Sequence, residues 1–192
     1  MKKKSKLKKF KFIPVSKPLI LREDVNSVQS TLRKGWISSE GPEVIKFEKN
    51  FSKLINRKFS ISVSNGTAAL EIAIKALGIK KGDEVITVAN TAIPTISAII
   101  NSGAVPKLTD IGDDYLIDCK KIEKSINKKT KAIIPVHLYG QTCNMNKIIR
   151  IAKKYKIEII EDCAQSQGSK FKNKFAGTFG KFGCFSFYPT KF

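Results

Sequence analysis

The chain has 192 residues, of which 42% are hydrophobic, so it can bury a core and does not have the composition of an intrinsically disordered protein. Its formal net charge is +20, but only four of its 36 basic residues are arginine, which argues against a nucleic-acid site because such sites usually rely on arginine. No apolar run approaches the roughly 18 to 20 residues that a membrane helix requires.

The first residues form a basic arm. Seven of the first 11 residues are lysine, and the segment lacks the apolar stretch of a secretory signal. We therefore expect a basic N-terminal arm over 1–16, a single domain over 17–192, and a cytoplasmic location. The arm also leaves open a weak, salt-dependent attachment to polyanions.

The cysteine pattern gives no sign of a metal site. Cys119, Cys143, Cys163 and Cys184 are widely spaced, no Cys-x-x-Cys is present, and the chain has one histidine, His137. Zinc sites need closely spaced pairs of such ligands. The sequence thus predicts reduced thiols and no metal.

Two helices are predicted in the first third of the chain. Apolar residues recur at helical spacing over 43–56, and 24–32 also suits a short helix. The segment between them contains Gly35, Gly41 and Pro42, which indicates a loop. Trp36 lies in this loop, and ordinary packing accounts for it.

Beyond residue 58, β-branched runs alternate with helical segments. The expected strands are 60–63, 84–88, 105–109, 132–136, 157–160 and 184–187. The expected helices are 67–77, 93–101, 118–126 and 145–155. This alternation predicts an α/β fold, with helices on both faces of a mostly parallel sheet in a three-layer α/β/α arrangement.

Polar residues follow most of these strands, where open α/β sheets bind ligands. Gly66 and Thr67 open a helix after the first strand, which suits either a phosphate cradle or a simple helix start. His137 follows the fourth strand, and a lone histidine of this kind is more often structural than catalytic.

The end of the chain supplies the clearest chemical signal. Asp162 and Gln165 follow the fifth strand, and Ser186 and Lys191 follow the last one. A lysine amine can form a Schiff base with pyridoxal phosphate, and a carboxylate can keep the pyridine nitrogen of that cofactor protonated. The pair therefore indicates a pyridoxal-phosphate site.

Five motifs in this order resemble the DegT/DnrJ/StrS family of sugar aminotransferases, which are fold-type-I pyridoxal-phosphate enzymes. The motifs are Gly35-Trp36 with Gly41-Pro42, and the segments 65–70, 136–141, 161–165 and 185–191. The resemblance runs from about Pro14 to the last residue. It implies the large-domain fold of that class, in incomplete form.

The resemblance also implies roles for the residues at the strand ends. Lys191 would hold the cofactor as a Schiff base and move a proton between substrate and cofactor. Asp162 would pair with the pyridine N–H, and Gln165 would contact the ring or its phenolic oxygen.

The phosphate of the cofactor would be held by Gly66, Thr67 and Ser186. One position departs from the family pattern, because Ala92 stands where many relatives place an aromatic residue over the cofactor ring. Stacking on the ring must then come from elsewhere or be absent.

The reaction implied is transamination of a nucleotide-linked keto-sugar, with an amino acid, usually glutamate, as donor. Such reactions serve amino-sugar and cell-surface polysaccharide biosynthesis, and the enzymes are usually homodimers. Some relatives have histidine at the position of Lys191 and are dehydratases, so the lysine favours transfer of an amino group.

Members of this family are about twice as long as this chain. We therefore expect 17–192 to be the N-terminal part of the large domain, without the C-terminal domain, and to be marginally stable and prone to associate. Two alternatives remain open. One is an inactive or split-gene fragment that acts as a binding or regulatory module, and the other is a polyanion-binding protein.

Overall fold

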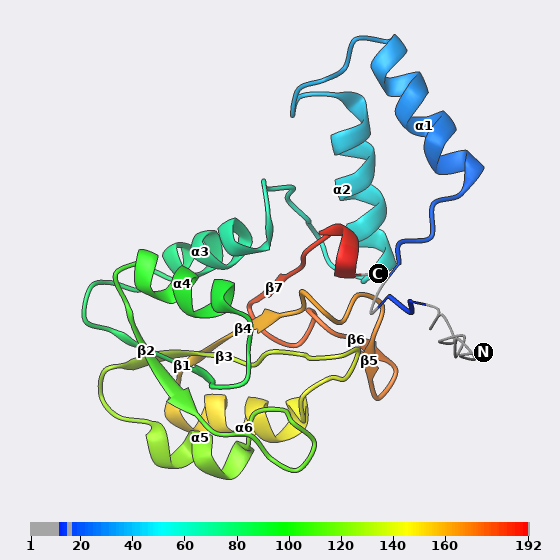
Figure 1. Cartoon of the computed structure of the whole chain (residues 1–192). Helices are drawn as coiled ribbons and strands as arrows, with labels where there is room; N and C mark the ends of the chain where they lie inside the picture. The colour runs from blue at the N-terminus through cyan, green and yellow to red at the C-terminus, as the bar shows by residue number, and fades with distance from the viewer. Residues whose placement is uncertain (1–11, 15–16, 192) are drawn as a thin grey trace, which may run out of the picture.

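The computed structural model describes residues 12–14 and 17–191 (Figure 1). The basic arm expected over 1–16 lies almost wholly outside the described residues, so its boundary stays a prediction. Within the described part, no helix has both the length and the apolar character needed to cross a bilayer.

The centre of the fold is a five-stranded parallel sheet. In spatial order its strands are β2 (Val105–Thr109), β1 (Glu84–Val88), β3 (Thr130–Ile134), β4 (Glu158–Asp162) and β7 (Phe182–Cys184). Each neighbouring pair is parallel. Because β2 and β3 lie on opposite sides of β1, the strand order reverses there, and parallel sheets bind ligands at such a switch point.

Helices cover both faces of the sheet (Figure 1). Helices α3 (Gly66–Ala76) and α4 (Ile93–Asn101) lie on one face, and α5 (Cys119–Ser125) and α6 (Met145–Tyr155) lie on the other. Each face has its own hydrophobic cluster, one around Ile74 and Ile99 and the other around Ile122 and Ile148, all fully buried. The expected three-layer α/β/α architecture is confirmed.

Helices α1 (Arg22–Arg33) and α2 (Pro42–Leu54) project from this body (Figure 1). Neither helix has a fully buried residue. The lower end of α2 touches the chain beyond β7, because the rings of Phe47 and Phe187 lie 5.0 Å apart and those of Phe51 and Phe185 lie 4.9 Å apart.

The prediction of a strand over 60–63 is wrong. The structure assigns no strand to these described residues, and the N–H of Ser62 donates to Glu48 Oε1 at 2.6 Å rather than to a neighbouring strand. Both 60–63 and β7 line a groove of about 750 Å³. The β-branched pattern is present, but the segment has no ladder partner.

The last strand is also shorter than expected and lies earlier in the chain. We expected it over 184–187, whereas β7 ends at Cys184 and 185–187 pair with no strand. A small hairpin was missed as well. It consists of β5 (Lys170–Phe171) and β6 (Lys174–Phe175), joined by Lys172 and Asn173, which both have positive φ angles, as a tight hairpin turn requires.

Candidate active site

A cavity of about 270 Å³ opens at the carboxyl ends of the strands. All six residues assigned to the cofactor site from the sequence line it, namely Gly66, Thr67, Asp162, Gln165, Ser186 and Lys191. These residues come from the start of α3, the end of β4 and the segment after β7. The fold thus brings together side chains that are as far as 125 residues apart in the sequence.

The start of α3 forms one wall of the cavity. Asn65 caps the helix, because its Oδ1 accepts from the N–H of Ala68 at 2.9 Å. The other N–H groups of a first helical turn have no partner within the helix and favour an anion. A Cβ at Gly66 would lie 3.1 Å from the Cβ of Ser186, so glycine lets the helix start approach Ser186 closely. This wall fits a phosphate group.

Ser186 is held in place through its backbone. The side-chain amide of Gln167 donates to the carbonyl oxygens of Ser186 and Ala164, the latter at 3.1 Å. Gln167 therefore ties the loop after β4 to the segment after β7. Sequence reasoning gave it no role.

Asp162 lies at the floor of the cavity and is only 4% exposed. Its Oδ2 accepts from the hydroxyl of Thr95 at 2.8 Å, and its Oδ1 accepts from the N–H of Ala164 at 3.1 Å. Burial raises the pKa of Asp162 above its ordinary value, and the hydrogen bonds from Thr95 and Ala164 and the charge of Lys191 act in the opposite direction.

Lys191 ends the short 3-10 helix η1 (Pro189–Lys191) and lines the same cavity. Its backbone N–H donates to the carbonyl of Tyr188 at 2.8 Å, which fixes the turn. The charge of Lys191 is the smallest of the influences that lower the pKa of Asp162, so the electrostatic coupling between the amine and the carboxylate is weak.

The remaining walls hold Gln165 and Ala92. The carbonyl of Gln165 accepts from the N–H of Gly140 at 2.9 Å, which places this loop against the segment that follows β3. Ala92 lines the cavity and offers no ring for stacking. Among the described lining residues, Tyr188 is the one aromatic side chain, and it is 64% exposed.

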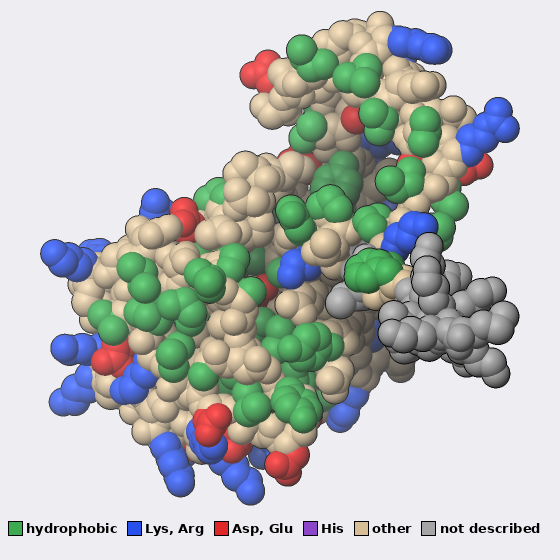
Figure 2. Space-filling model, viewed as in Figure 1, with side chains coloured by type: hydrophobic (Ala, Val, Ile, Leu, Met, Phe, Trp, Pro, Cys, Tyr) green, Lys and Arg blue, Asp and Glu red, His purple; other side chains and the backbone are tan. Residues whose placement is uncertain are grey.

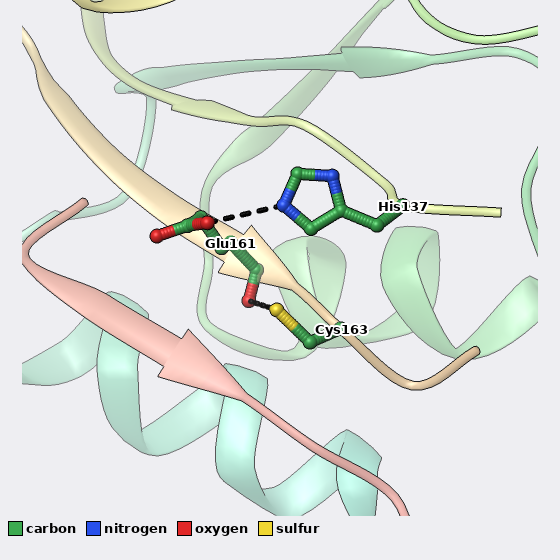
Figure 3. Close-up of side chains that lie close together, drawn as sticks. All are labelled: His137, Glu161 and Cys163. Atoms are coloured by element: carbon green, nitrogen blue, oxygen red, sulfur yellow. Dashed lines mark hydrogen bonds and ion pairs between the residues drawn. The ribbon is translucent and has the colours of Figure 1, made fainter. Parts of the chain in front are cut away.

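His137 lies outside the lining of this cavity and is fully buried. Its Nδ1 accepts from the N–H of Cys143 at 3.0 Å, so Nε2 carries the proton and donates to Glu161 Oε2 at 3.1 Å (Figure 3). Both ring nitrogens are occupied by partners within the core. The structural interpretation of His137 fits these contacts.

Glu161 is the centre of this buried cluster. Besides His137, it accepts from the backbone N–H groups of Gly177, Phe179 and Gly180 at 2.6–2.8 Å. It therefore anchors the loop that leads into β7. Adjacent residues of a strand point to opposite faces, a signal that could have separated Glu161 from Asp162 at the sequence level.

The ligand atoms of His137, Glu161 and Cys163 lie within 4.8 Å of one another. Each of these side chains already has a hydrogen-bond partner (Figure 3). Burial also raises the pKa of the Cys163 thiol well above its ordinary value, which disfavours the thiolate that a metal would need. Hydrogen bonding accounts for this cluster.

Comparison with known proteins decides the family. The model of the DegT/DnrJ/EryC1/StrS aminotransferase family matches residues 18–192. The chain belongs to this family. The predicted resemblance is thus confirmed.

Three relatives illustrate the match. The chain is 42% identical to a GDP-perosamine synthase of Escherichia coli O157:H7 over 94% of its own length and 50% of that protein. It superposes on a proposed sugar aminotransferase from Streptococcus pneumoniae, in its PLP form, with a TM-score of 0.89 and 32% identity, over 93% of this chain and 49% of the other. A GDP-4-keto-6-deoxymannose-3-dehydratase with a trapped PLP-glutamate geminal diamine matches with a TM-score of 0.86 and 31% identity, over 92% and 47%.

Two conclusions follow from these DegT-family relatives. The chain spans about half the length of the curated relatives it matches. Pyridoxal phosphate is the cofactor of the family, as expected. The glycine-lined helix start, the buried carboxylate and the lysine that share one cavity suit the phosphate, the pyridine nitrogen and the aldehyde carbon of that cofactor.

Proposed function

We propose that this DegT-family chain is the cofactor-binding part of an aminotransferase that acts on a nucleotide-linked keto-sugar. The observation that carries the proposal is the single cavity that holds Lys191, Asp162 and the glycine-lined start of α3. A volume of about 270 Å³ lies just below the roughly 300–1,000 Å³ typical of ligand pockets, which suits a small cofactor better than a whole nucleotide sugar.

Each lining residue has a proposed task. The N–H groups of Gly66 and Thr67 and the hydroxyl of Ser186 bind the cofactor phosphate, with the dipole of α3 favouring the negative charge. Gln165 contacts the cofactor ring or its phenolic oxygen. These contacts fix the cofactor at the strand ends.

Chemistry falls to two residues. Bound pyridoxal phosphate supplies an electron sink for negative charge at the amino-acid Cα. The carboxylate of Asp162 keeps a proton on the pyridine nitrogen, which sustains that sink. The Nζ of Lys191 would hold the cofactor covalently and would be the base that moves a proton at the amino-acid Cα.

The relatives support the choice of substrates. GDP-perosamine synthase and the dTDP-amino-sugar transaminases among them act on nucleotide-linked sugars, and the dehydratase structure holds glutamate. We extend a nucleotide-linked keto-sugar and glutamate to this protein. Lys191 favours amino transfer over dehydration. A place in cell-surface polysaccharide biosynthesis and a cytoplasmic location complete the proposal.

A homodimer is part of the same proposal. Leu21, Val25, Val28 and Leu32 recur at helical spacing along α1 and are 47–60% exposed. Figure 2 shows hydrophobic side chains gathered along the projecting helices. A second copy of the chain would cover this stripe.

The test is the first half of the reaction. The purified chain, loaded with pyridoxal phosphate and mixed with L-glutamate, is expected to release one equivalent of 2-oxoglutarate. Lys191→Ala is expected to lower the rate by about 10²- to 10⁴-fold, because the proton carrier is lost. Cofactor binding without any 2-oxoglutarate would favour an inactive binding module instead.

A further inference from the structure

The hydroxyls of two threonines form a series of two hydrogen bonds that ends on the carboxylate of Asp162. Thr95 is 1% exposed, and its Oγ1 lies 2.8 Å from Asp162 Oδ2. The Oγ1 of Thr91 lies 2.7 Å from that of Thr95. Both threonines line the cavity. Neither had a role in the sequence analysis.

The direction of these hydrogen bonds follows from counting protons. A hydroxyl carries one hydrogen, and an ionised carboxylate can only accept. With Asp162 ionised, the hydroxyl of Thr95 therefore donates its hydrogen to Asp162, and the oxygen of that hydroxyl accepts a hydrogen bond from Thr91. Protonation of Asp162 would allow the opposite direction, so the two hydroxyls and the carboxylate form one coupled unit.

We propose that Thr91 and Thr95 are positioning residues that orient Asp162 and hold its carboxylate in the ionised form. The inference rests on the proposed function, because the partner of that carboxylate is the protonated pyridine nitrogen of the cofactor. Neither threonine contacts the reacting atoms in this account.

The surroundings of Asp162 show why such support is needed. Burial disfavours the charged form and so raises the pKa of this carboxyl. The hydrogen bond from Thr95 is the largest of the influences that lower this pKa. Hydrogen bonds to a charged acceptor are about twice as strong as neutral ones, and a donor chain strengthens its last member. Lys191 in η1 is the nearby cation whose charge also lowers the pKa of Asp162.

The geometry of the carboxylate supports the orienting role. Thr95 holds one oxygen and the N–H of Ala164 holds the other, so the side chain cannot rotate without losing a bond. Thr95 itself is fixed in the first turn of α4, where its N–H donates to the carbonyl of Ala92 at 3.2 Å. The remaining lone pairs of Asp162 are left for a donor in the cavity.

The test measures the pKa of Asp162 directly, by carbon NMR of the aspartate-labelled chain without cofactor. Thr95→Val is expected to raise the pKa by at least about half a unit, and Thr95→Ser to restore it. Thr91→Val, which removes only the second donor, is expected to raise it by less. Asp162→Asn identifies the resonance.

Thr87→Val is the matched control. Thr87 is also fully buried in this fold, but its hydroxyl donates to the carbonyl of Ile134 at 2.9 Å rather than to a carboxylate. It should cost comparable stability and leave the pKa of Asp162 unchanged. An unchanged pKa in Thr95→Val, or equal shifts in Thr95→Val and Thr87→Val, would overturn the inference.

Two further arms keep the outcomes separate. If Thr95→Val does not fold, Thr91→Val tests the inference in its place. An unchanged pKa of Asp162 in Thr91→Val also contradicts the proposed role of the two threonine hydroxyls. Failure of the chain to bind pyridoxal phosphate would count against the proposed function while leaving the NMR result intact. Normal cofactor binding together with an unchanged pKa of Asp162 in Thr95→Val would contradict this inference and leave the proposed function standing.

Discussion

At the scale of single residues, Glu161 and Asp162 show how neighbouring carboxylates receive different tasks. Glu161 is fully buried and accepts four N–H groups from the core, whereas Asp162 faces the cavity with two donors. Their positions on opposite faces of β4 separate an anchor from a functional group. The residue types alone do not reveal this division.

Asp162 should lower the stability of the cofactor-free chain as the pH rises. Its pKa is raised in the folded state by burial, so the folded protein binds the proton more tightly than the unfolded one. Stability from this group is present at acid pH and is lost as the pH rises through the folded pKa.

Asp162→Asn removes that titration. We expect the melting temperature of the variant, relative to that of the unchanged chain, to increase as the pH rises from acid to neutral. Thermal unfolding at a series of pH values measures the difference in melting temperature between the variant and the unchanged chain. The difference at acid pH gives the effect of losing a carboxylate oxygen as an acceptor, and it is subtracted from the difference at higher pH. A difference that is constant with pH would contradict the prediction.

Glu161→Ala should destabilise the fold strongly. The substitution leaves three backbone N–H groups and the N–H of His137 without their buried acceptor, and each buried donor left unsatisfied costs about 1–3 kcal/mol. Glu158→Ala is the control, because Glu158 lies exposed on the same strand and should change stability by less than about 0.5 kcal/mol. Urea unfolding compares the two. Equal losses would show that Glu161 is not an anchor.

At the scale of elements, the helices were the most predictable part of the chain. The helix expected over 145–155 is α6 to the residue, because Ile148, Ile151 and Ala152 repeat on one buried face. Strands β1 and β2 were also placed as observed. The helical period of apolar residues and a run of β-branched residues are local properties of the chain, so helices and strands of this kind can be predicted from the sequence.

The errors concern pairing, which is not local. Residues 60–63 have the composition of a strand, but no neighbouring strand reaches them within the described structure. The hairpin β5–β6 escaped because its strands have only two residues each. Four of the six predicted site residues, which are Asp162, Gln165, Ser186 and Lys191, lie at or after the ends of β4 and β7, whereas Gly66 and Thr67 follow a segment that forms no strand. The contacts of Thr95 and Gln167 are ones that only the folded chain reveals.

At the scale of the whole molecule, apolar surface is the main feature. The groove between 60–63 and β7 is lined by Phe59, Ile61 and Val63 among others, and α1 exposes its apolar stripe. Large exposed patches of this kind usually mark interfaces. The chain should therefore associate in solution.

Val28→Lys tests the contribution of α1 to that association. Val28 is 60% exposed in the middle of the stripe, and a charge there should weaken self-association at least about tenfold, or roughly 1.4 kcal/mol. Ser30→Lys is the control, since Ser30 is also exposed and lies on the opposite side of α1. Sedimentation velocity over a concentration series measures the effect. Equal association of both variants would exclude α1 from the interface.

The central claim is that this chain builds a pyridoxal-phosphate site around Lys191. The most direct measurement is an absorbance titration with pyridoxal phosphate, followed by borohydride reduction and peptide mapping. The account predicts a visible absorbance band and one reduced cofactor fixed on Lys191, both absent in Lys191→Ala. No band, or label scattered over the many surface lysines, would contradict it.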